Sequence, residues 1–186
     1  TVLLPVRDEM PERLRRAVRS ILDQSFTDIE VLLLNDGSRN TGTLAALQAL
    51  SSEDARIRLM HLAPSGLTAA LNEGLRAARG TFVARQDSDD WSHPDRLARQ
   101  AAWLRQDDRR VLAGSGVALH DESGEMLWTV EMPLDPDQIR SVFPSGNPFI
   151  HGAACFRRDA AARCGGYRPE LDGSEDYDFF WRLSET

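Results

Sequence analysis

The chain has 186 residues, the length of one ordinary domain with a full hydrophobic core. Its hydrophobic content of 41% and charged content of 27% are typical of a soluble globular protein, and no apolar run approaches the roughly 20 residues of a membrane span. The formal net charge of −7 argues against nucleic acid as a partner, because proteins that bind it present a basic surface.

The first half of the chain alternates strand-like and helix-like patterns, which is typical of a parallel α/β sheet. Apolar runs predict strands over 1–6, 29–34, 56–62 and 81–85. Apolar residues at helical spacing predict helices over 12–24, 41–50 and 67–78, and a fourth helix after Pro94.

The pattern changes after Arg110. Runs over 111–120 and 125–130 flank Asp121-Glu122-Ser123-Gly124, which predicts a hairpin turn. A short helix over 135–142, a Pro/Gly-rich mobile loop over 143–148 and a last strand over 150–156 follow. Ser174 is expected to cap a final helix. Since the chain lacks an initiator Met and stops inside that helical pattern, we expect it to be a piece of a longer protein.

Two residue-type biases bear on function. All 22 basic residues are arginine, which favours forked phosphate contacts, although biased codon usage is the simpler explanation. Cys155 and Cys164 do not have the spacing of a metal-binding pair, so we expect free thiols and a reducing, cytoplasmic environment.

Two short acidic motifs follow predicted strands. They are Asn35-Asp36-Gly37-Ser38 and Asp87-Ser88-Asp89-Asp90. In open α/β sheets, ligands bind at the carboxyl edge, where such motifs would lie. Carboxylates two residues apart can hold a hard cation, which can in turn bind phosphate oxygens. The motifs therefore predict a site for a nucleotide diphosphate and a metal ion.

Further motifs along the chain fit the same site. Near the start are Pro5-Val6-Arg7-Asp8-Glu9, Ser20-Ile21-Leu22-Asp23-Gln24-Ser25-Phe26 and Asn35-Asp36-Gly37-Ser38. Gly66-Leu67, Asn72-Glu73-Gly74-Leu75, Ala78-Arg79-Gly80 and Arg85-Gln86-Asp87-Ser88-Asp89-Asp90 follow, and the series ends with Glu175-Asp176 and Trp181-Arg182-Leu183. In this order the motifs resemble those of family 2 glycosyltransferases, of the bacterial cell-surface polysaccharide type. The resemblance runs from Pro5 to Leu183.

The resemblance implies the GT-A fold, a Rossmann-like, mostly parallel sheet flanked by helices, with a small mixed β region in the C-terminal half. It implies one catalytic domain over 1–186, with a nucleotide-binding half over 1–110 and an acceptor-side half over 111–186. It also implies an inverting hexosyltransferase that moves a sugar from a nucleotide-diphosphate sugar to a glycan or lipid-linked acceptor with Mg²⁺ or Mn²⁺. The enzyme would work in the cytoplasm, at the inner face of the cell membrane, with peripheral membrane association through segments outside this chain.

The resemblance also assigns roles to residues. Asp36 would accept a hydrogen bond from uracil, with guanine as the alternative base, and Asp176 would be the general base. The expected metal ligands are Asp89, Asp87 and His151. The expected substrate-binding residues are Pro5, Val6, Arg7, Glu9, Asp36, Arg79, Arg85, Asp87, Ser88 and Glu175.

Each of these residues also has a simpler structural interpretation. Asp36 could cap a turn, the acids at 87–90 could form a solvated turn, and His151 could be structural. Asp176 could be a capping acid at the start of a helix, a role compatible with catalysis. Glu175 is the second candidate base, because spacing alone does not separate it from Asp176.

Two other functions remain as alternatives. A nucleotidyltransferase shares the sheet type and the cation, but its first loop should be rich in Gly and basic residues, whereas this one reads Arg7-Asp8-Glu9-Met10-Pro11. A non-catalytic nucleotide-sugar binding module of a larger synthase would not need an intact set of acids. The chain also lacks the Gln-x-x-Arg-Trp motif of processive synthases.

Overall fold

The computed structural model describes residues 1–121 and 123–186. The parallel part contains β1 (Val2–Val6), α1 (Pro11–Leu22), β2 (Val31–Asp36), α2 (Thr41–Glu53), β3 (Ile57–Leu62), α3 (Leu67–Ala77), β4 (Phe82–Arg85) and α4 (Arg96–Arg105). The remainder contains β5 (Leu112–Ala113), β6 (Val117–His120), β7 (Met126–Val130), α5 (Pro136–Val142), β8 (Cys155–Arg157), α6 (Arg158–Arg163) and α7 (Glu175–Ser184), with short 3₁₀ turns at His151–Ala153 and Pro169–Leu171.

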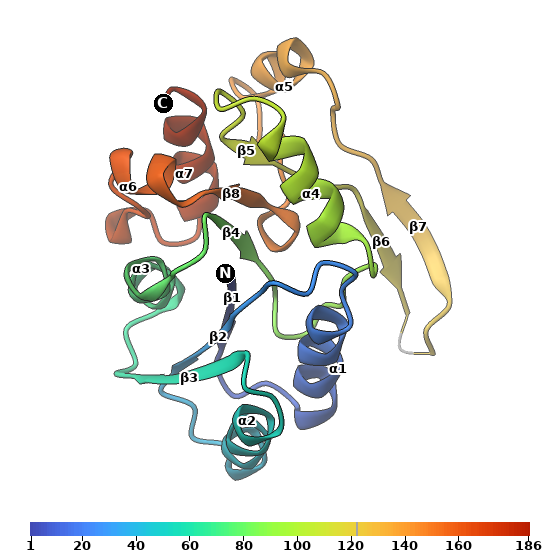
Figure 1. The fold of residues 1–186 in the computed structure, drawn as a ribbon, viewed down its shortest axis with the longest axis vertical. Coiled ribbons are helices and arrows are strands. Elements are labelled where there is room, and N and C mark those ends of the chain that lie inside the picture. Colours follow the sequence, from blue (N-terminus) through green and yellow to red (C-terminus); the bar gives the residue numbers. More distant parts are fainter. Residues whose placement is uncertain (122) are drawn as a thin grey trace.

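The main sheet has the strand order β3-β2-β1-β4-β8-β5 (Figure 1). Strands β3, β2, β1 and β4 are parallel, and β8 runs antiparallel to both β4 and β5. Strands β6 and β7 form a separate antiparallel hairpin at the side of the molecule. The predicted parallel sheet with a small mixed β region is confirmed.

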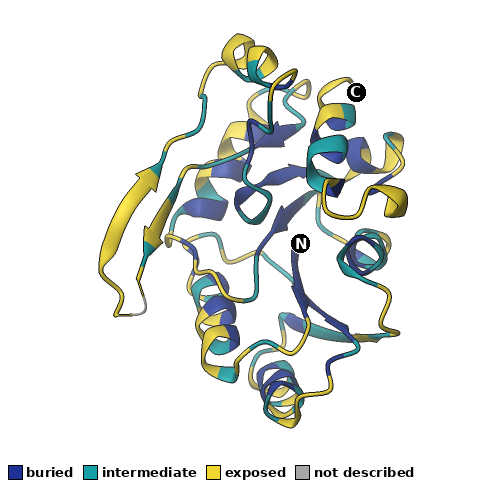
Figure 2. Cartoon of the chain, turned by 180° about the vertical axis from the view of Figure 1, so that it is seen from behind, coloured by how far each residue is buried: buried dark blue, intermediate teal, exposed yellow. Residues whose placement is uncertain are grey.

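Helices cover both faces of the main sheet because alternate residues of its buried strands point to opposite faces. Leu4 and Leu33 pack with α1, α2 and α4, whereas Leu3 and Leu32 pack with α3, α6 and α7. Figure 2 shows the buried strands enclosed between these helices and the exposed hairpin outside them. The rigid sheet therefore fixes the loops at its carboxyl edge.

Several predicted boundaries are wrong. The run over 111–120 is split between two sheets, with β5 and β6 separated by Gly114-Ser115-Gly116. Within the strand predicted over 150–156, His151–Ala153 forms a 3₁₀ turn, and the observed strand, Cys155–Arg157, begins only after it and pairs with β4 and β5. The predicted hairpin turn includes Glu122, which lies outside the described residues.

Two helix details also differ from the predictions. Helix α6 was not predicted, because it is short and follows β8 directly. Ser174 precedes α7 as expected, but its side chain makes no capping hydrogen bond. Among the described residues, no helix combines the length and apolar character needed to cross a membrane.

Candidate active site

The sheet changes its direction of winding between β1 and β4, the place at which doubly wound sheets form a crevice for a ligand. These strands pair only through Val2 and Leu3 of β1, so they separate before β1 ends at the buried Pro5 and Val6. Pro5 has no N–H with which to extend the pairing. Ligands of doubly wound sheets bind at such a switch point, at the carboxyl ends of the strands.

Asp36 is the last residue of β2 and is buried. Its Oδ1 accepts a hydrogen bond from the Ser65 amide at 2.7 Å, and its Oδ2 accepts one from the Gly66 amide at 3.1 Å. Arg7, in the loop after β1, donates to Oδ2 from 3.3 Å. The carboxylate therefore joins three loops, and its remaining lone pairs can still accept a bond from a ligand.

Asp8 joins the loops after β1 and β2 in a way that the sequence did not reveal. Its backbone has a φ of 51°, a left-handed conformation that asparagine and aspartate tolerate better than most residues. The Asp8 Oδ1 accepts bonds from the Arg39 and Asn40 amides at 2.6 and 2.7 Å. These bonds lower the pKa of Asp8 below its ordinary value.

Glu9 and Ser88 face one another across the crevice. The Ser88 hydroxyl donates to Glu9 Oε2 at 3.5 Å, and Glu9 Oε1 accepts a bond from the Met10 amide at 2.8 Å. The structure thus brings the loop after β1 next to the acidic motif after β4. This is the arrangement predicted for two segments that contact the same ligand.

Arg85, at the end of β4, forms an ion pair with Asp87, the first residue of the acidic motif. Arg85 Nη2 lies 2.7 Å from Asp87 Oδ1, and the arginine side chain is 4% exposed. Gly152 lies against the same carboxylate, because a Cβ atom there would be 2.2 Å from Asp87 Oδ2. Gly152 lies in the 3₁₀ turn before β8, and its sequence context did not indicate this close approach.

The acids of the motif suit a hard cation. Asp89 is exposed and makes no ion pair or hydrogen bond within the described chain. Burial, and then the charges of Asp87 and Asp89, raise the pKa of Asp90 above its ordinary value. A divalent cation would relieve this repulsion, and Mg²⁺ is commonly held by one or two carboxylates together with substrate phosphates and water.

The polar contacts of the His151 ring are with Tyr167 and Glu175. Its Nε2 is 3.1 Å from the Tyr167 hydroxyl, and its Nδ1 is 3.8 Å from Glu175 Oε1. Burial first, and the Arg85 charge second, lower the pKa of His151 to about 3, so the ring is neutral at pH 7. Among the described residues no three His, Cys, Asp or Glu side chains group together as a ready-made metal site, so the expected ligands Asp87, Asp89 and His151 stay a prediction.

The two acids at the start of α7 have different surroundings. Glu175 is buried, and its Oε2 accepts a bond from the Gly173 amide at 2.7 Å. Asp176 is half-buried and lines an open hollow of about 460 Å³; its Oδ2 accepts a bond from Asn147 Nδ2 at 2.9 Å. The geometry therefore makes Asp176 the more accessible of the two carboxylates.

The model of "Glycosyl transferase family 2" matches residues 1–165. The chain belongs to this family. Its relatives include the O-antigen biosynthesis glycosyltransferase WbnJ of Escherichia coli, 30% identical over 90% of this chain and 65% of that protein. The putative glycosyltransferase EpsE of Bacillus subtilis is 33% identical over 92% of this chain and 62% of its own length. The chain thus spans less than two thirds of these relatives.

Solved glycosyltransferases share the architecture of this family 2 domain. The mannosyltransferase PcManGT of Pyrobaculum calidifontis, solved with GDP-Man and Mn²⁺, superposes with a TM-score of 0.73 at 21% identity, over 98% of this chain and 50% of that one. Staphylococcus aureus TarS gives the same TM-score at 18% identity, over 98% of this chain and 33% of its own. The predicted GT-A fold is confirmed.

One predicted residue of this family 2 domain lies outside the site. The Arg79 amide donates to Glu30 Oε1 at 2.7 Å, and the same oxygen accepts a bond from the Thr1 hydroxyl at 2.7 Å. Thr1 and Glu30 precede β1 and β2, so Arg79 is at the amino edge of the sheet. The proposed nucleotide site is at the opposite, carboxyl edge of the sheet.

Proposed function

We propose that this domain is the catalytic part of an inverting glycosyltransferase that transfers a hexose from a nucleotide-diphosphate sugar to a glycan or lipid-linked acceptor. The observation that carries the proposal is that the loop after β1 contacts both Asp36, through Arg7, and Ser88 of the acidic motif, through Glu9. The division into a nucleotide-binding half, 1–110, and an acceptor-side half, 111–186, is part of the proposal.

The nucleoside is proposed to lie in the crevice beside Asp36. The Asp36 carboxylate accepts bonds from two amides and Arg7, and it retains acceptor capacity for one base N–H. Uracil N3–H suits it, so we propose a uridine diphosphate sugar. Guanine N1–H has the same donor character, and PcManGT was solved with a guanosine donor.

The acids at 87–90 are proposed to hold Mg²⁺ or Mn²⁺ together with the diphosphate. Asp89 is the principal ligand in this proposal, because it is exposed and unpaired within the described chain, whereas Asp87 is partly neutralised by Arg85. The solved complex of PcManGT with Mn²⁺ supports a cation in a related fold. When bound, the cation would neutralise charge on the departing diphosphate.

Asp176 is proposed to take the proton from the acceptor hydroxyl. In inversion the acceptor oxygen attacks the anomeric carbon from the side opposite the leaving diphosphate, so the base stands on the acceptor side. Asp176 lines an open hollow, and Asn147 fixes its carboxylate. Glu175 instead faces His151 and the Gly173 amide. A positioned base supplies about 10²–10⁴-fold in rate.

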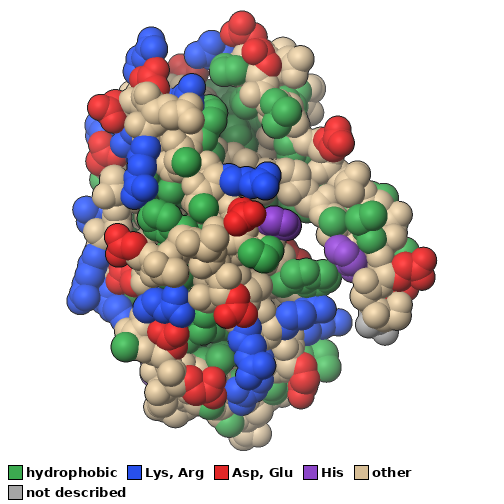
Figure 3. Space-filling view, turned by 45° about the vertical axis from the view of Figure 1, so that its right-hand side comes forward, with side chains coloured by type: hydrophobic (Ala, Val, Ile, Leu, Met, Phe, Trp, Pro, Cys, Tyr) green, Lys and Arg blue, Asp and Glu red, His purple; other side chains and the backbone are tan. Residues whose placement is uncertain are grey.

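Surface charge supports a small substrate over nucleic acid. Figure 3 shows acidic and basic side chains mixed over the visible face, without a continuous basic patch. A cytoplasmic location stays a prediction. The free thiols of Cys155 and Cys164 are in keeping with the reducing compartment that it requires.

A binding panel tests the proposal. Uridine and guanosine diphosphates should raise the melting temperature in the presence of Mn²⁺, because ligands that bind only the folded state stabilise it. Asp89→Ala should abolish most of the cation-dependent shift. Asp137→Ala, which removes a 90% exposed side chain on α5, is the matched control. Equal shifts in the parent and Asp89→Ala would refute the cation site, and no shift with any diphosphate would refute the nucleotide site.

Donor turnover separates the enzyme from its two alternatives. Slow Mn²⁺-dependent hydrolysis of a nucleotide-diphosphate sugar to the diphosphate and free sugar is expected for a glycosyltransferase. A non-catalytic module would bind the donor without hydrolysing it, and a nucleotidyltransferase would release pyrophosphate from a nucleoside triphosphate.

A further inference from the structure

The chain that joins α6 to α7 leads directly to the proposed base. This α6–α7 segment comprises residues 164–174, and Asp176 is the second residue of α7. Residues 168–174 of the segment are exposed, and the side chain of Ser174 makes no capping hydrogen bond with α7. The position of the first turn of α7 therefore depends in part on the elements to which this segment is attached.

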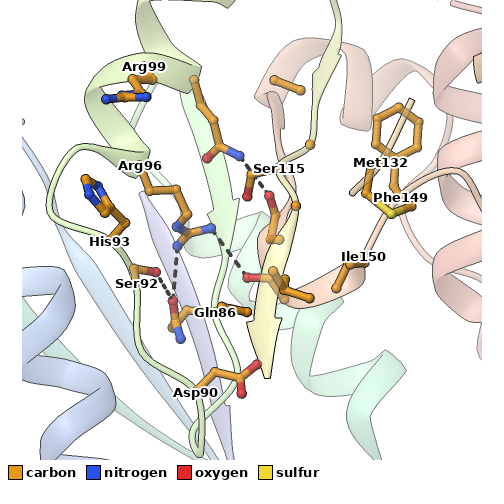
Figure 4. Close-up of a pocket in the computed structure, with 18 of the residues that line it drawn as sticks. Gln86, Asp90, Ser92, His93, Arg96, Arg99, Ser115, Met132, Phe149 and Ile150 are labelled. Atoms are coloured by element: carbon orange, nitrogen blue, oxygen red, sulfur yellow. Dashed lines mark hydrogen bonds between the residues drawn. The ribbon is translucent and has the colours of Figure 1, made fainter. Parts of the chain in front are cut away.

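The acidic motif is held by a separate set of contacts. Gln86 Oε1 accepts hydrogen bonds from Ser92 Oγ at 2.7 Å and from Arg96 Nη2 at 3.1 Å (Figure 4). Arg96 also donates to the Arg85 carbonyl at 3.0 Å. These bonds attach both ends of the motif to α4, and none of them involves the α6–α7 segment. The contacts that position the segment thus lie elsewhere.

Helix α3 holds the α6–α7 segment through polar side chains on one face. Thr68 and Asn72 are four residues apart, so they lie on the same side of the helix. Asn72 Nδ2 donates to the Tyr167 carbonyl at 2.8 Å, and Asn72 Oδ1 accepts a bond from the Tyr167 amide at 2.9 Å. Thr68 Oγ1 donates to Asp172 Oδ1 at 2.7 Å. Figure 1 shows α3 beside the chain that connects α6 to α7.

The two attachments differ in their surroundings. The Asn72 amide forms a pair of bonds with the backbone of Tyr167, whose side chain is buried, and these bonds fix the part of the segment next to α6. Thr68 is also buried, but its partner Asp172 is an exposed residue close to the start of α7. The bond between Thr68 and Asp172 is therefore the attachment nearer to Asp176, and it can be removed at Asp172 without a change in the core.

The same end of α3 contacts the proposed nucleotide site. Gly66, the residue before α3, donates its amide hydrogen to Asp36 Oδ2 at 3.1 Å. A Cβ atom at Gly66 would lie 3.9 Å from Asp172 Oδ2. The Asp172 carboxylate is therefore next to the loop that binds Asp36, at the amino end of a helix, where negative charge is favourable. Gly66 and Thr68 thus connect the Asp36 carboxylate to Asp172.

We propose that Asp172 is a positioning residue that couples the nucleotide site to the helix that carries Asp176. When a nucleotide bound at Asp36 fixes the loop at 65–66, the bond between Thr68 and Asp172 restrains the first turn of α7 and with it the proposed base. This inference rests on the proposed glycosyltransferase function and adds to it a residue that acts through α7.

Hydrogen exchange measured by mass spectrometry tests the coupling. Saturating uridine diphosphate with Mn²⁺ should slow the exchange of the backbone amides of 173–180 in the parent by about fivefold or more, because coupling between two sites is commonly of this size. Asp172→Ala and Thr68→Val should each remove most of this slowing. Saturation keeps the nucleotide-bound fraction equal in all samples. Full slowing in both variants would overturn the inference.

Matched variants separate coupling from a general loss of structure. Glu170→Ala removes an exposed acid of the same segment that makes no ion pair with any described residue, and Thr41→Val changes an exposed threonine at the start of α2. Both controls should keep the slowing. If they lose it as Asp172→Ala does, the effect is not specific to the Thr68–Asp172 bond and the inference is wrong.

The conservative variant Asp172→Asn tests the bond itself. Its amide oxygen can still accept the Thr68 hydroxyl hydrogen, so this variant should restore most of the slowing that Asp172→Ala removes. If Asp172→Asn behaves like Asp172→Ala, the negative charge rather than the bond to Thr68 is responsible, and the inference is overturned. A variant that loses stability in urea titrations but keeps the slowing would show a structural role alone and would also overturn it.

The outcomes distinguish this inference from the proposed function. The rise in melting temperature caused by uridine diphosphate with Mn²⁺ is measured on the same samples. If the parent shows this rise without slower exchange at 173–180, the coupling is wrong and the nucleotide site stands. If the parent shows no rise with any nucleoside diphosphate, the proposed function is wrong, and the coupling is wrong with it.

Discussion

Gly152 controls the position of the Asp87 carboxylate. A Cβ atom at 152 would overlap Asp87 Oδ2 at 2.2 Å, whereas one at Gly146 would meet nothing within 4 Å. Gly152→Ala should displace the Asp87 carboxylate and weaken Mn²⁺-dependent diphosphate binding by about tenfold, which corresponds to about 1.4 kcal/mol of binding free energy. Gly146→Ala, in the loop before it, is the matched control. Equal diphosphate affinities by calorimetry would show that the Asp87 position is unimportant.

The proton acceptor is tested at Asp176. Asp176→Asn keeps the shape of the side chain and its bond to the Tyr177 amide but removes the basic oxygen. Transfer to a glycoside acceptor should fall by about 10²–10⁴-fold with donor binding unchanged. Glu175→Gln, the adjacent buried acid, should retain transfer. If the two variants show the reverse, Glu175 is the base.

At the residue scale, the sequence predicted the acids better than their partners. Asp36, Asp87 and Asp89 follow apolar runs, and strand geometry alone brings them to one edge. Asp8 and Gly152 were missed because their roles depend on contacts between loops distant in sequence. Nothing in the local pattern carries that information.

At the element scale, Arg182 attaches α7 to the turn that follows α6. It donates to the Cys164 carbonyl at 2.6 Å and to the Gly166 carbonyl at 2.8 Å, and it pairs with Asp178. These contacts orient the helix that begins with Glu175 and Asp176. Hydrogen bonds to charged groups contribute about 1.5–3 kcal/mol each.

Arg182→Met should therefore loosen α7 and lower the free energy of unfolding by about 2–4 kcal/mol in urea titrations. The rate of sugar transfer should fall by a larger factor than the affinity for the diphosphate, because the loops proposed to bind the nucleotide follow β1, β2 and β4 and not α7. Arg163→Met removes an exposed arginine of α6 that pairs with Asp159, and it should change stability by less than about 1 kcal/mol. Similar losses in both variants would contradict the role of Arg182 as an anchor.

Helices and strands were predictable where apolar residues recur at helical or strand spacing without interruption over the whole element. The four parallel strands and their helices match the predicted ranges to within a few residues. The C-terminal half was harder, because β5 and β8 are only two and three residues long and gain their stability from pairing in the sheet. The segment over 111–120, predicted as one run, divides between two sheets at Gly114-Ser115-Gly116.

The stability of the whole molecule should depend on pH through His151. The folded pKa of about 3 is below the ordinary value of 6.5, so between these values the unfolded chain binds a proton that the folded chain does not. The free energy of unfolding should thus fall by about 2 kcal/mol from pH 7 to pH 5, at about 1.4 kcal/mol per unit below 6.5. His151→Gln should flatten this decline in urea titrations at the two pH values; an unchanged slope would assign it to other groups.

A second decline should follow in stronger acid. Burial alone would raise the pKa of Glu30, but hydrogen bonds from Thr1, Arg58 and the Arg79 amide outweigh it and lower that pKa to about 2. Because the folded pKa is below the ordinary 4.5, this stabilisation is complete above pH 4.5 and is lost as the pH falls towards 2. The amino edge of the sheet, where Glu30 lies, is thereby sensitive to acid.

The reactivity of the buried Cys155 thiol reports how readily β8 separates from the main sheet. The thiol lies in β8, which is antiparallel to its two neighbours β4 and β5, and burial raises its pKa to about 11. A thiol reagent can reach it only when β8 leaves the sheet, so the rate of alkylation measures how often the two parts of the sheet separate. Cys164, half-buried after α6, should react faster in the same sample. The alkylation rate of Cys155 relative to that of Cys164 would therefore measure this separation of β8 from the sheet, with Cys164 as the internal reference.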